Sequence, residues 1–165
     1  MALSKIDGTN LITGLPAGSV LQTVQGTTNS AATITSATLT DTGLSGAITP
    51  SSTSNKILVI SNSMVYASRA DNTQHLDIAL LRDTTNIFNP STSSGSPPKA
   101  FDINIDGASG TYYRVIIPMC YLDSPSTTSS TTYKVQGACR TADSGTSVWQ
   151  EGSMTSVITL IEIAG

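Results

Sequence analysis

Apolar and polar residues alternate along much of this chain, which is the pattern of strands with one face toward a core. The segment Ser19–Gly26 alternates in this way, and Ala31–Thr40 repeats the pattern with Ile34 as its apolar member. Lys56–Tyr66 begins as a continuous apolar run and then alternates, which is typical of a central strand of a sandwich. No stretch keeps apolar residues at helical spacing for three turns, so the pattern predicts strands throughout.

The middle of the chain predicts a hairpin, a long loop and a further strand. Gln74–Asn89 carries apolar residues on both sides of a polar tip at Arg82–Asn86. Pro90–Lys99 has the proline, glycine and serine density of an exposed loop, because its two adjacent prolines remove two donors from any sheet ladder. Apolar and polar residues alternate again in Phe101–Asp106, so we expect a strand there.

The last third of the chain predicts more strands around a second polar loop, Asp123–Ser130. Pro118, inside the predicted strand Thr111–Leu122, favours an edge position or a bulge. The remaining predicted strands are Thr131–Arg140, Ser147–Trp149 and Met154–Ile163. Both faces of the last strand are largely apolar, so both should be covered. A set of about eight strands predicts an all-β fold, a jelly-roll-like two-sheet antiparallel sandwich.

Residues 1–17 do not share the strand pattern. Short apolar pieces are separated there by glycine, proline and polar residues, so the segment cannot bury its own apolar side chains. We expect an extended N-terminal arm, held by a symmetry mate or a host surface, followed by a β-domain over residues 18–165. The anchoring residues would be the apolar ones of the arm, Leu3, Ile6, Leu11, Ile12 and Leu15.

Composition narrows the choice of partners. Only 12% of the residues are charged, the formal net charge is −3 and the pI is about 4.8, so there is no basic surface for a phosphate backbone. We therefore expect no nucleic acid partner. No segment approaches the roughly 18 consecutive apolar residues of a membrane span, and the N-terminus lacks a signal-peptide pattern. We expect a chain made in the cytoplasm and not inserted into a membrane.

Candidate catalytic residues are few. His75 and Asp77 would project to the same face of a strand, but no nucleophile motif accompanies them. Surface placement is the stronger interpretation for this pair. The sequence also lacks a phosphate-binding loop, a dinucleotide fingerprint and the Cys/His spacing of a zinc site. We expect no enzymatic activity and no cofactor.

One short segment matches the opening of a calcium loop. Asp102, Asn104 and Asp106, followed by Gly107, fit the pattern D-x-[DN]-x-[DN]-G, in which alternating oxygens converge on one ion. The twelfth position of such a loop would be Tyr113 instead of the bidentate glutamate, and no flanking helices are predicted. A strand with a polar face that ends in a turn is therefore the stronger interpretation.

The cysteines and aromatic residues lie within predicted strands. We favour two buried thiols for Cys120 and Cys139, with a bridge between neighbouring strands as the alternative. Trp149, near the loop Thr141–Thr146, is the best candidate for an exposed contact. The tyrosines are too scattered for a carbohydrate platform and suit the core or an interface; they include Tyr112, Tyr113, Tyr121 and Tyr133.

Several strings of the chain resemble a family of virion structural proteins of tailed phages, especially phages of marine bacteria and cyanobacteria. The most specific is DTGLSGAITPSSTSNKILV, together with LPAGSVLQTVQG, IALLRDTTNIF, YLDSPSTTSSTTYKVQG and SVITLIEIAG. Members are described as tail-fibre, head-fibre or capsid-decoration proteins. The resemblance implies a homotrimer with a jelly-roll-like domain, an N-terminal segment that attaches to the virion, and a partner such as the major capsid protein.

The chain lacks the long shaft repeat of a fibre, which favours a head-decoration or cement protein on the virion surface. The alternative is a short tail or head fibre whose outer loops contact a host glycan or receptor. Those loops would be Pro90–Lys99, Asp123–Ser130 and Thr141–Glu151. The candidate contact residues within or near them are Pro97, Lys99, Thr127 and Trp149.

Overall fold

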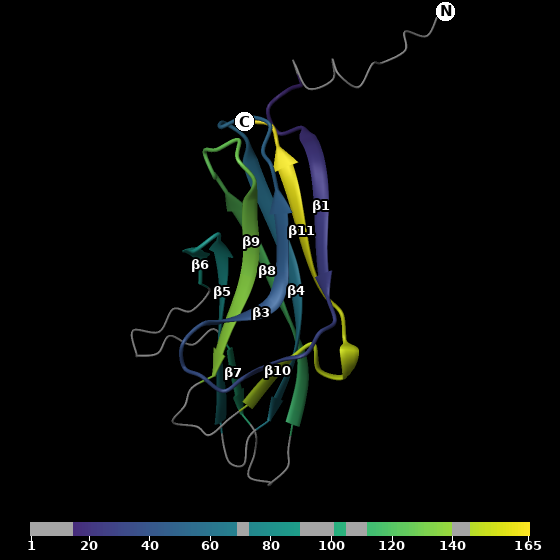
Figure 1. Cartoon of the computed structure of the whole chain (residues 1–165), viewed down its shortest axis with the longest axis vertical. Coiled ribbons are helices and arrows are strands. Elements are labelled where there is room, and N and C mark those ends of the chain that lie inside the picture. The colour runs from purple at the N-terminus through teal and green to yellow at the C-terminus, as the bar shows by residue number, and fades with distance from the viewer. Residues whose placement is uncertain (1–14, 69–72, 90–100, 105–111, 140–145) are drawn as a thin grey trace, which may run out of the picture.

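The computed structural model describes residues 15–68, 73–89, 101–104, 112–139 and 146–165, without the side chains of 68, 73–75, 101–104 and 112. Two antiparallel sheets face each other (Figure 1). Within the described residues, sheet A contains β1 (Val20–Thr28), β2 (Ala32–Ile34), β4 (Lys56–Ser68), β8 (Tyr112–Asp123), β10 (Thr146–Trp149) and β11 (Ser156–Ile163). Sheet B contains β3 (Thr40–Ile48), β5 (Thr73–Arg82), β6 (Thr85–Phe88), β7 (Phe101–Asn104) and β9 (Thr131–Cys139).

The pairing of the longer strands defines a jelly roll. β1 pairs with β11, β3 with β9, β4 with β8 and β5 with β7, so the chain is a long hairpin folded over into two sheets. The resulting order is β1-β11-β4-β8 in sheet A, and β3-β9-β5 followed by β6 and β7 in sheet B. Two interleaved antiparallel sheets in this order form the double-sheet jelly roll. The predicted fold class is confirmed.

The inner faces of the two sheets fill the space between them with apolar side chains. On β4 the inward positions include Ile57, Val59 and Val65, all fully buried. Trp149 of β10 lies against Gly137 of β9, where a Cβ atom would overlap the indole ring. A small residue at 137 therefore allows sheet B to approach the ring that sheet A contributes.

The prediction for the segment after β1 was wrong in part. Ala31–Thr40 was expected as one strand, but only the three residues of β2 form a strand there, and the long strand β3 begins at Thr40. The alternation of apolar and polar residues is hard to recognise in β3 because the strand contains two glycines. Gly43 has a φ of 82°, and the pairing with β9 shifts between Asp41 and Ser45. This β-bulge interrupts the two-residue period on which the prediction depends.

The other predicted strands are confirmed, with small shifts of their bounds. The predicted hairpin tip at Arg82–Asn86 shrinks to the turn Asp83–Thr84, where Asp83 has a φ of 53°. Pro118 belongs to β8 and lies opposite Asn62 of β4. Among the described strands, β8 pairs only with β4. The edge position expected for Pro118 is confirmed, and the β4–β8 register runs past it without a bulge.

Candidate functional site

The start of the β-domain is fixed to the end of the last strand. Gly18 N–H donates to Ala164 O at 2.8 Å, and Ala164 N–H donates to Ser19 O at 2.9 Å. Ser19 N–H also donates to Pro16 O at 3.1 Å, which closes a turn just before β1. Figure 1 shows the C-terminus beside the start of β1. We call this end of the sandwich the arm end, because the described chain begins here, directly after the predicted N-terminal arm.

A buried carboxylate stabilises the arm end. Glu162 of β11 is fully buried, and its Oε1 accepts hydrogen bonds from Ser51 N–H at 2.6 Å, Ser51 Oγ at 2.8 Å and Asn55 Nδ2 at 2.6 Å. Its Oε2 accepts one from Gln22 Nε2 at 2.6 Å. Burial alone would raise the pKa of Glu162, but these hydrogen bonds outweigh it and lower the pKa. The ionised carboxylate therefore holds the loop before β4 against β1 and β11.

A hollow of about 310 Å³ opens beside Ser51 and Asn55, two of the residues that donate to Glu162. Leu15, the one predicted anchoring residue within the described part of the chain, lines it and is half-buried. The other lining residues are Leu21, Ser51, Ser52, Ser54, Asn55, Ala164 and Gly165. Three serines and Asn55 thus give the wall hydrogen-bonding groups beside the apolar Leu15 and Leu21.

A second buried carboxylate joins the two sheets near the same end. Asp123 of β8 accepts hydrogen bonds from Arg82 of β5 at 2.9 and 3.1 Å and from the Tyr133 hydroxyl of β9 at 2.7 Å. Burial raises the pKa of Tyr133 far above its ordinary value, and the neighbouring Asp123 adds to this shift. The phenol therefore stays protonated and donates. Asp123 is thus a structural link between the sheets.

Part of the outward side of sheet A is apolar and exposed to solvent. We call it the sheet A face and define it by Leu58, Ile60, Met64, Ile116, Leu122 and Ile161. Ile60, Ile116 and Leu122 are exposed by 38%, 59% and 47%. Across β4 and β8 these residues form neighbouring rows, with Leu58 opposite Leu122 and Met64 opposite Ile116.

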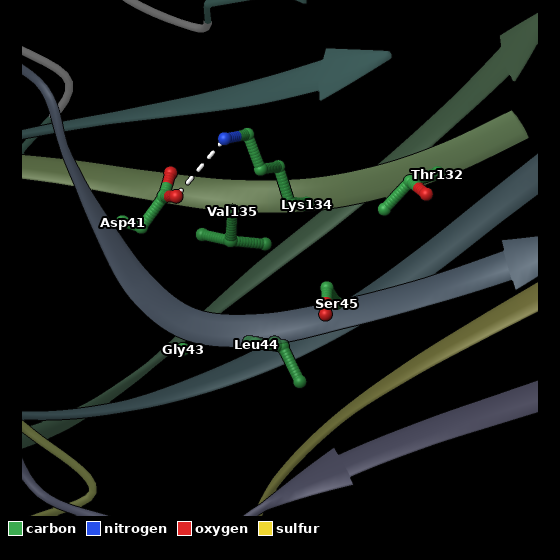
Figure 2. A pocket seen from close by; sticks show the side chains of 7 residues that line it. All are labelled: Asp41, Gly43, Leu44, Ser45, Thr132, Lys134 and Val135. Carbon is green, nitrogen blue, oxygen red and sulfur yellow. Dashed lines mark hydrogen bonds and ion pairs between the residues drawn. The ribbon is translucent and has the colours of Figure 1, made fainter. Parts of the chain in front are cut away.

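The outward side of sheet B is polar where it is exposed. Figure 2 shows Asp41 and Lys134 facing each other across β3 and β9, with the carboxylate 2.9 Å from the ammonium. Burial would raise the pKa of Asp41, but hydrogen bonds from Gln136 and Lys134 lower it overall. The bulge at Gly43 opens a hollow of about 120 Å³ beside this pair. It is too small for a typical ligand pocket, which measures about 300–1,000 Å³.

Several predicted site residues lie outside the described residues. They are Leu3, Ile6, Leu11 and Ile12 of the arm, Pro97 and Lys99 of the first expected loop, and Asp106 of the calcium motif. Thr127 is described and half-buried. Its loop follows Asp123. Asp123 and Glu162 lie opposite the same residue of β4, Ile57, so this loop is at the arm end.

The interpretation of Trp149 as an exposed contact was wrong. Trp149 is fully buried, and its indole N–H donates to Ser147 Oγ at 3.2 Å. Tyr133 is fully buried as well, whereas Tyr113 is exposed by 41%. Because strand alternation at Ser147–Trp149 points the ring toward sheet B, its large apolar surface fills the core. These two buried rings cannot contribute to a carbohydrate platform.

The prediction for the cysteines was half right. Cys139 is buried and donates to Ser147 Oγ at 3.0 Å, while Cys120 is exposed, and neither cysteine forms a disulfide. The expectation of a buried Cys120 failed because β8 is an edge strand whose outward positions are not covered by the chain itself. Cys120 lies opposite Ile60 on the sheet A face.

Most candidate metal and catalytic residues, His75, Asp102 and Asn104, have side chains outside the described part of the structure, so only their strand positions are known. Asp102 and Asn104 belong to β7, and His75 lies opposite Asp102 in β5. Asp77 is buried, and burial raises the pKa of its carboxyl despite hydrogen bonds from Ile78 N–H and Asn89. Among the described residues, no three His, Cys, Asp or Glu side chains are grouped closely enough for a metal ion. No described helix could span a membrane.

Two features escaped the sequence analysis. Glu162 is the one charged residue in the strand Ser156–Ile163, and a lone carboxylate in an apolar alternation is a signal for a buried, hydrogen-bonded charge. The sheet A face escaped because both sides of β4 and β11 are apolar, so alternation alone could not show which side lies in the core. The candidate contact residues were instead predicted within or near the exposed loops.

No family model and no curated protein sequence matches this chain. Among solved structures, it is similar to the crystal structure of the infectious bursal disease virus VP2 subviral particle, with 13% identity, 88% of this chain and 39% of that chain covered, and a TM-score of 0.42. It is also similar to the structure of the infectious bursal disease virus Gx strain, with 14% identity, 89% of this chain and 39% of that chain covered, and a TM-score of 0.41. The chain spans about two fifths of each of these solved chains. At these TM-scores the likeness carries no argument about function.

Proposed function

We propose that this chain is a non-enzymatic structural protein of a phage virion that decorates or cements the head surface through its N-terminal arm. The observation that carries the proposal is the arm end. There the root of the arm is hydrogen-bonded to the last strand, and Glu162 ties the same strand to the loop before β4. Tension on an arm bound to another protein would therefore be transmitted directly into sheet A.

Other features agree with a structural role. The interior is packed, and the two buried carboxylates Glu162 and Asp123 serve as structural links. The jelly-roll order agrees with what the resemblance to tailed-phage virion proteins implies. That resemblance also supports the major capsid protein, or another virion protein, as the partner, and a homotrimer as the assembled form.

The position of one candidate host-contact loop, Asp123–Ser130, favours decoration over host attachment. A loop that contacts a host would face away from the anchoring arm. The loop that carries Thr127 instead lies at the arm end, beside the residues that fix the root of the arm. We therefore prefer the decoration role to the fibre role for this loop.

Deletion of residues 1–14 tests the proposal, because it removes the arm but keeps the root at Leu15–Ser19. We expect the truncated chain to keep its unfolding temperature and to lose sedimentation with virions that lack their own copy of the chain. A variant with residues 1–14 in scrambled order is the matched control for length and charge. If the truncated chain still binds the particles as the full chain does, the anchoring role is wrong.

A further inference from the structure

Two serines occupy the centre of the inward side of β4. The inward positions of this strand are buried throughout, and they are Ile57, Val59, Ser61, Ser63, Val65 and Ala67. The apolar members of this row belong to the hydrophobic core, and the two serines between them are exposed by only 1% and 0%. Two hydroxyls therefore lie next to each other in the middle of an apolar core.

Neither hydroxyl has a hydrogen-bond partner in the part of the chain that the structure describes. The inward neighbours of Ser61 in sheet A are apolar, with Ile158 of β11 on one side and Met119 of β8 on the other. Ser63 lies opposite Ile117 of β8. Sheet B is about 10 Å away across the sandwich, too far for a serine to reach its backbone. Because a buried unpaired hydroxyl destabilises the folded state, we expect both to have a partner from outside the chain.

The spacing of the two serines fits one bridging water molecule. Residues on one face of a strand are two positions apart, which is about 6.6 Å at a rise of about 3.3 Å per residue. The two hydroxyls do not bond to each other. Two O–H···O hydrogen bonds in series through one water span about 5.5 Å, so each oxygen needs to lean toward the other by only about half an ångström.

The small size of the two side chains provides room for a water. Protein interiors are close-packed, and a buried water needs the space of about one probe sphere and at least two polar partners. Serine is smaller than Val59 and Val65, the residues that precede and follow the pair in the inward row, so two serines in succession take volume out of this row. Each hydroxyl donates one hydrogen bond and accepts up to two, so the pair supplies the partners.

We propose that Ser61 and Ser63 form a binding site for one ordered water molecule, which bridges their hydroxyls inside the core. The neighbouring inward residues of sheet A carry no charge, so an ion bound here would lose its hydration without a countercharge, whereas a neutral water would not. The bridge satisfies both hydroxyls at once, so loss of either serine leaves the other without its partner. The proposal is independent of the proposed function, because it concerns the middle of the core and not the arm end.

A double-mutant cycle, measured by urea unfolding of the full chain with circular dichroism, tests the bridge. Ser61→Ala and Ser63→Ala each leave one buried hydroxyl without a partner, so each should lower the folding equilibrium constant about fivefold. The double variant leaves no hydroxyl at the site and should be no less stable than either single variant. Ser147→Ala is the matched control, because Ser147 lies opposite Ala67, about 20 Å along β4 from Ser61. Its effect should multiply with that of Ser61→Ala.

The sign of the single effects separates a bridged pair from two dry hydroxyls. Without a water, each alanine removes an unpaired buried group, so single variants as stable as the wild-type chain or more stable would overturn the proposal. Single effects that multiply in the double variant to about 25-fold would also overturn it, because the two hydroxyls would then have separate partners. A crystal structure gives the direct readout: we expect a water oxygen about 2.8 Å from both Oγ atoms, and two hydroxyls bonded to protein atoms alone would contradict the site.

Discussion

Two buried carboxylates flank Ile57 at the arm end, and the chain stabilises them by different means. Glu162 lies on one side of Ile57 in β11, and Asp123 on the other side in β8. Asp123 meets the guanidinium of Arg82 and a phenol, whereas every donor found for Glu162 is neutral. A buried carboxylate thus needs enough donors, and a cation is only one way to supply them.

The difference also separates two tasks. Asp123 receives its donors from β5 and β9 of sheet B, so it joins the two sheets. Glu162 receives its donors from β1 and from the loop before β4, so it fixes the part of sheet A to which the arm is attached. Four substitutions would test this comparison.

Glu162→Ala should have the largest effect. It leaves the Asn55 amide and the Ser51 N–H without their acceptor in a buried place, which we expect to cost about 3 kcal/mol of unfolding free energy. Urea unfolding at a fixed protein concentration, followed by the fluorescence of Trp149, the chain's one tryptophan, measures it. A loss below about 1 kcal/mol, the size of an exposed ion pair, would show that water takes over the hydrogen bonds of the missing carboxylate at little cost.

Glu162→Gln sharpens the comparison through pH. Because the pKa of Glu162 is lowered in the folded protein, its stabilisation is complete above its ordinary value of 4.5 and is lost as the pH falls below it. We expect the wild-type chain to lose stability between about pH 5 and pH 3, and Glu162→Gln to lose less over that interval. Unfolding curves at several pH values test this, and parallel pH profiles would contradict the assignment.

Tyr133→Phe tests the Asp123 side. It removes one hydrogen bond to a buried carboxylate that keeps Arg82, so we expect a loss of about 1.5 kcal/mol at pH 7. The raised pKa of Tyr133 means that its stabilisation is complete below its ordinary value of 10 and is lost above it. Stability of the wild-type chain should therefore fall above about pH 10, and less so in the variant. Identical alkaline profiles would show that folding does not raise the pKa of Tyr133.

Lys134→Ala should have the smallest effect and serves as the surface reference. Its ion pair with Asp41 is partly exposed, with side-chain exposures of 25% and 55%, so we expect less than about 1 kcal/mol. The effect should shrink further in about 1 M salt, where charges are screened within roughly 3 Å. A large effect that persists in salt would mean that β3 depends on this pair despite its exposure.

Sequence analysis located most strands because alternation is a local property of the chain. It failed at β3, where Gly43 and the bulge break the period, and at Trp149, where the direction of one ring depends on which side faces the other sheet. Of the candidate site, the sequence pointed to Leu15, while the rest of the predicted arm lies outside the described residues. It did not provide Glu162, whose donors lie 107 to 140 residues away along the chain.

The sequence by itself determined the all-β class, the approximate strand set and the absence of a recognisable catalytic motif, because these depend on periodicity and local composition. Only the tertiary structure decided which of the two apolar sides of β4 and β11 enters the core. That choice is made by the first-with-last pairing of the jelly roll, which seats sheet B on one side of sheet A and leaves Ile60, Ile116 and Leu122 on the other. Contacts far apart in sequence set this pairing, so no local pattern contains it.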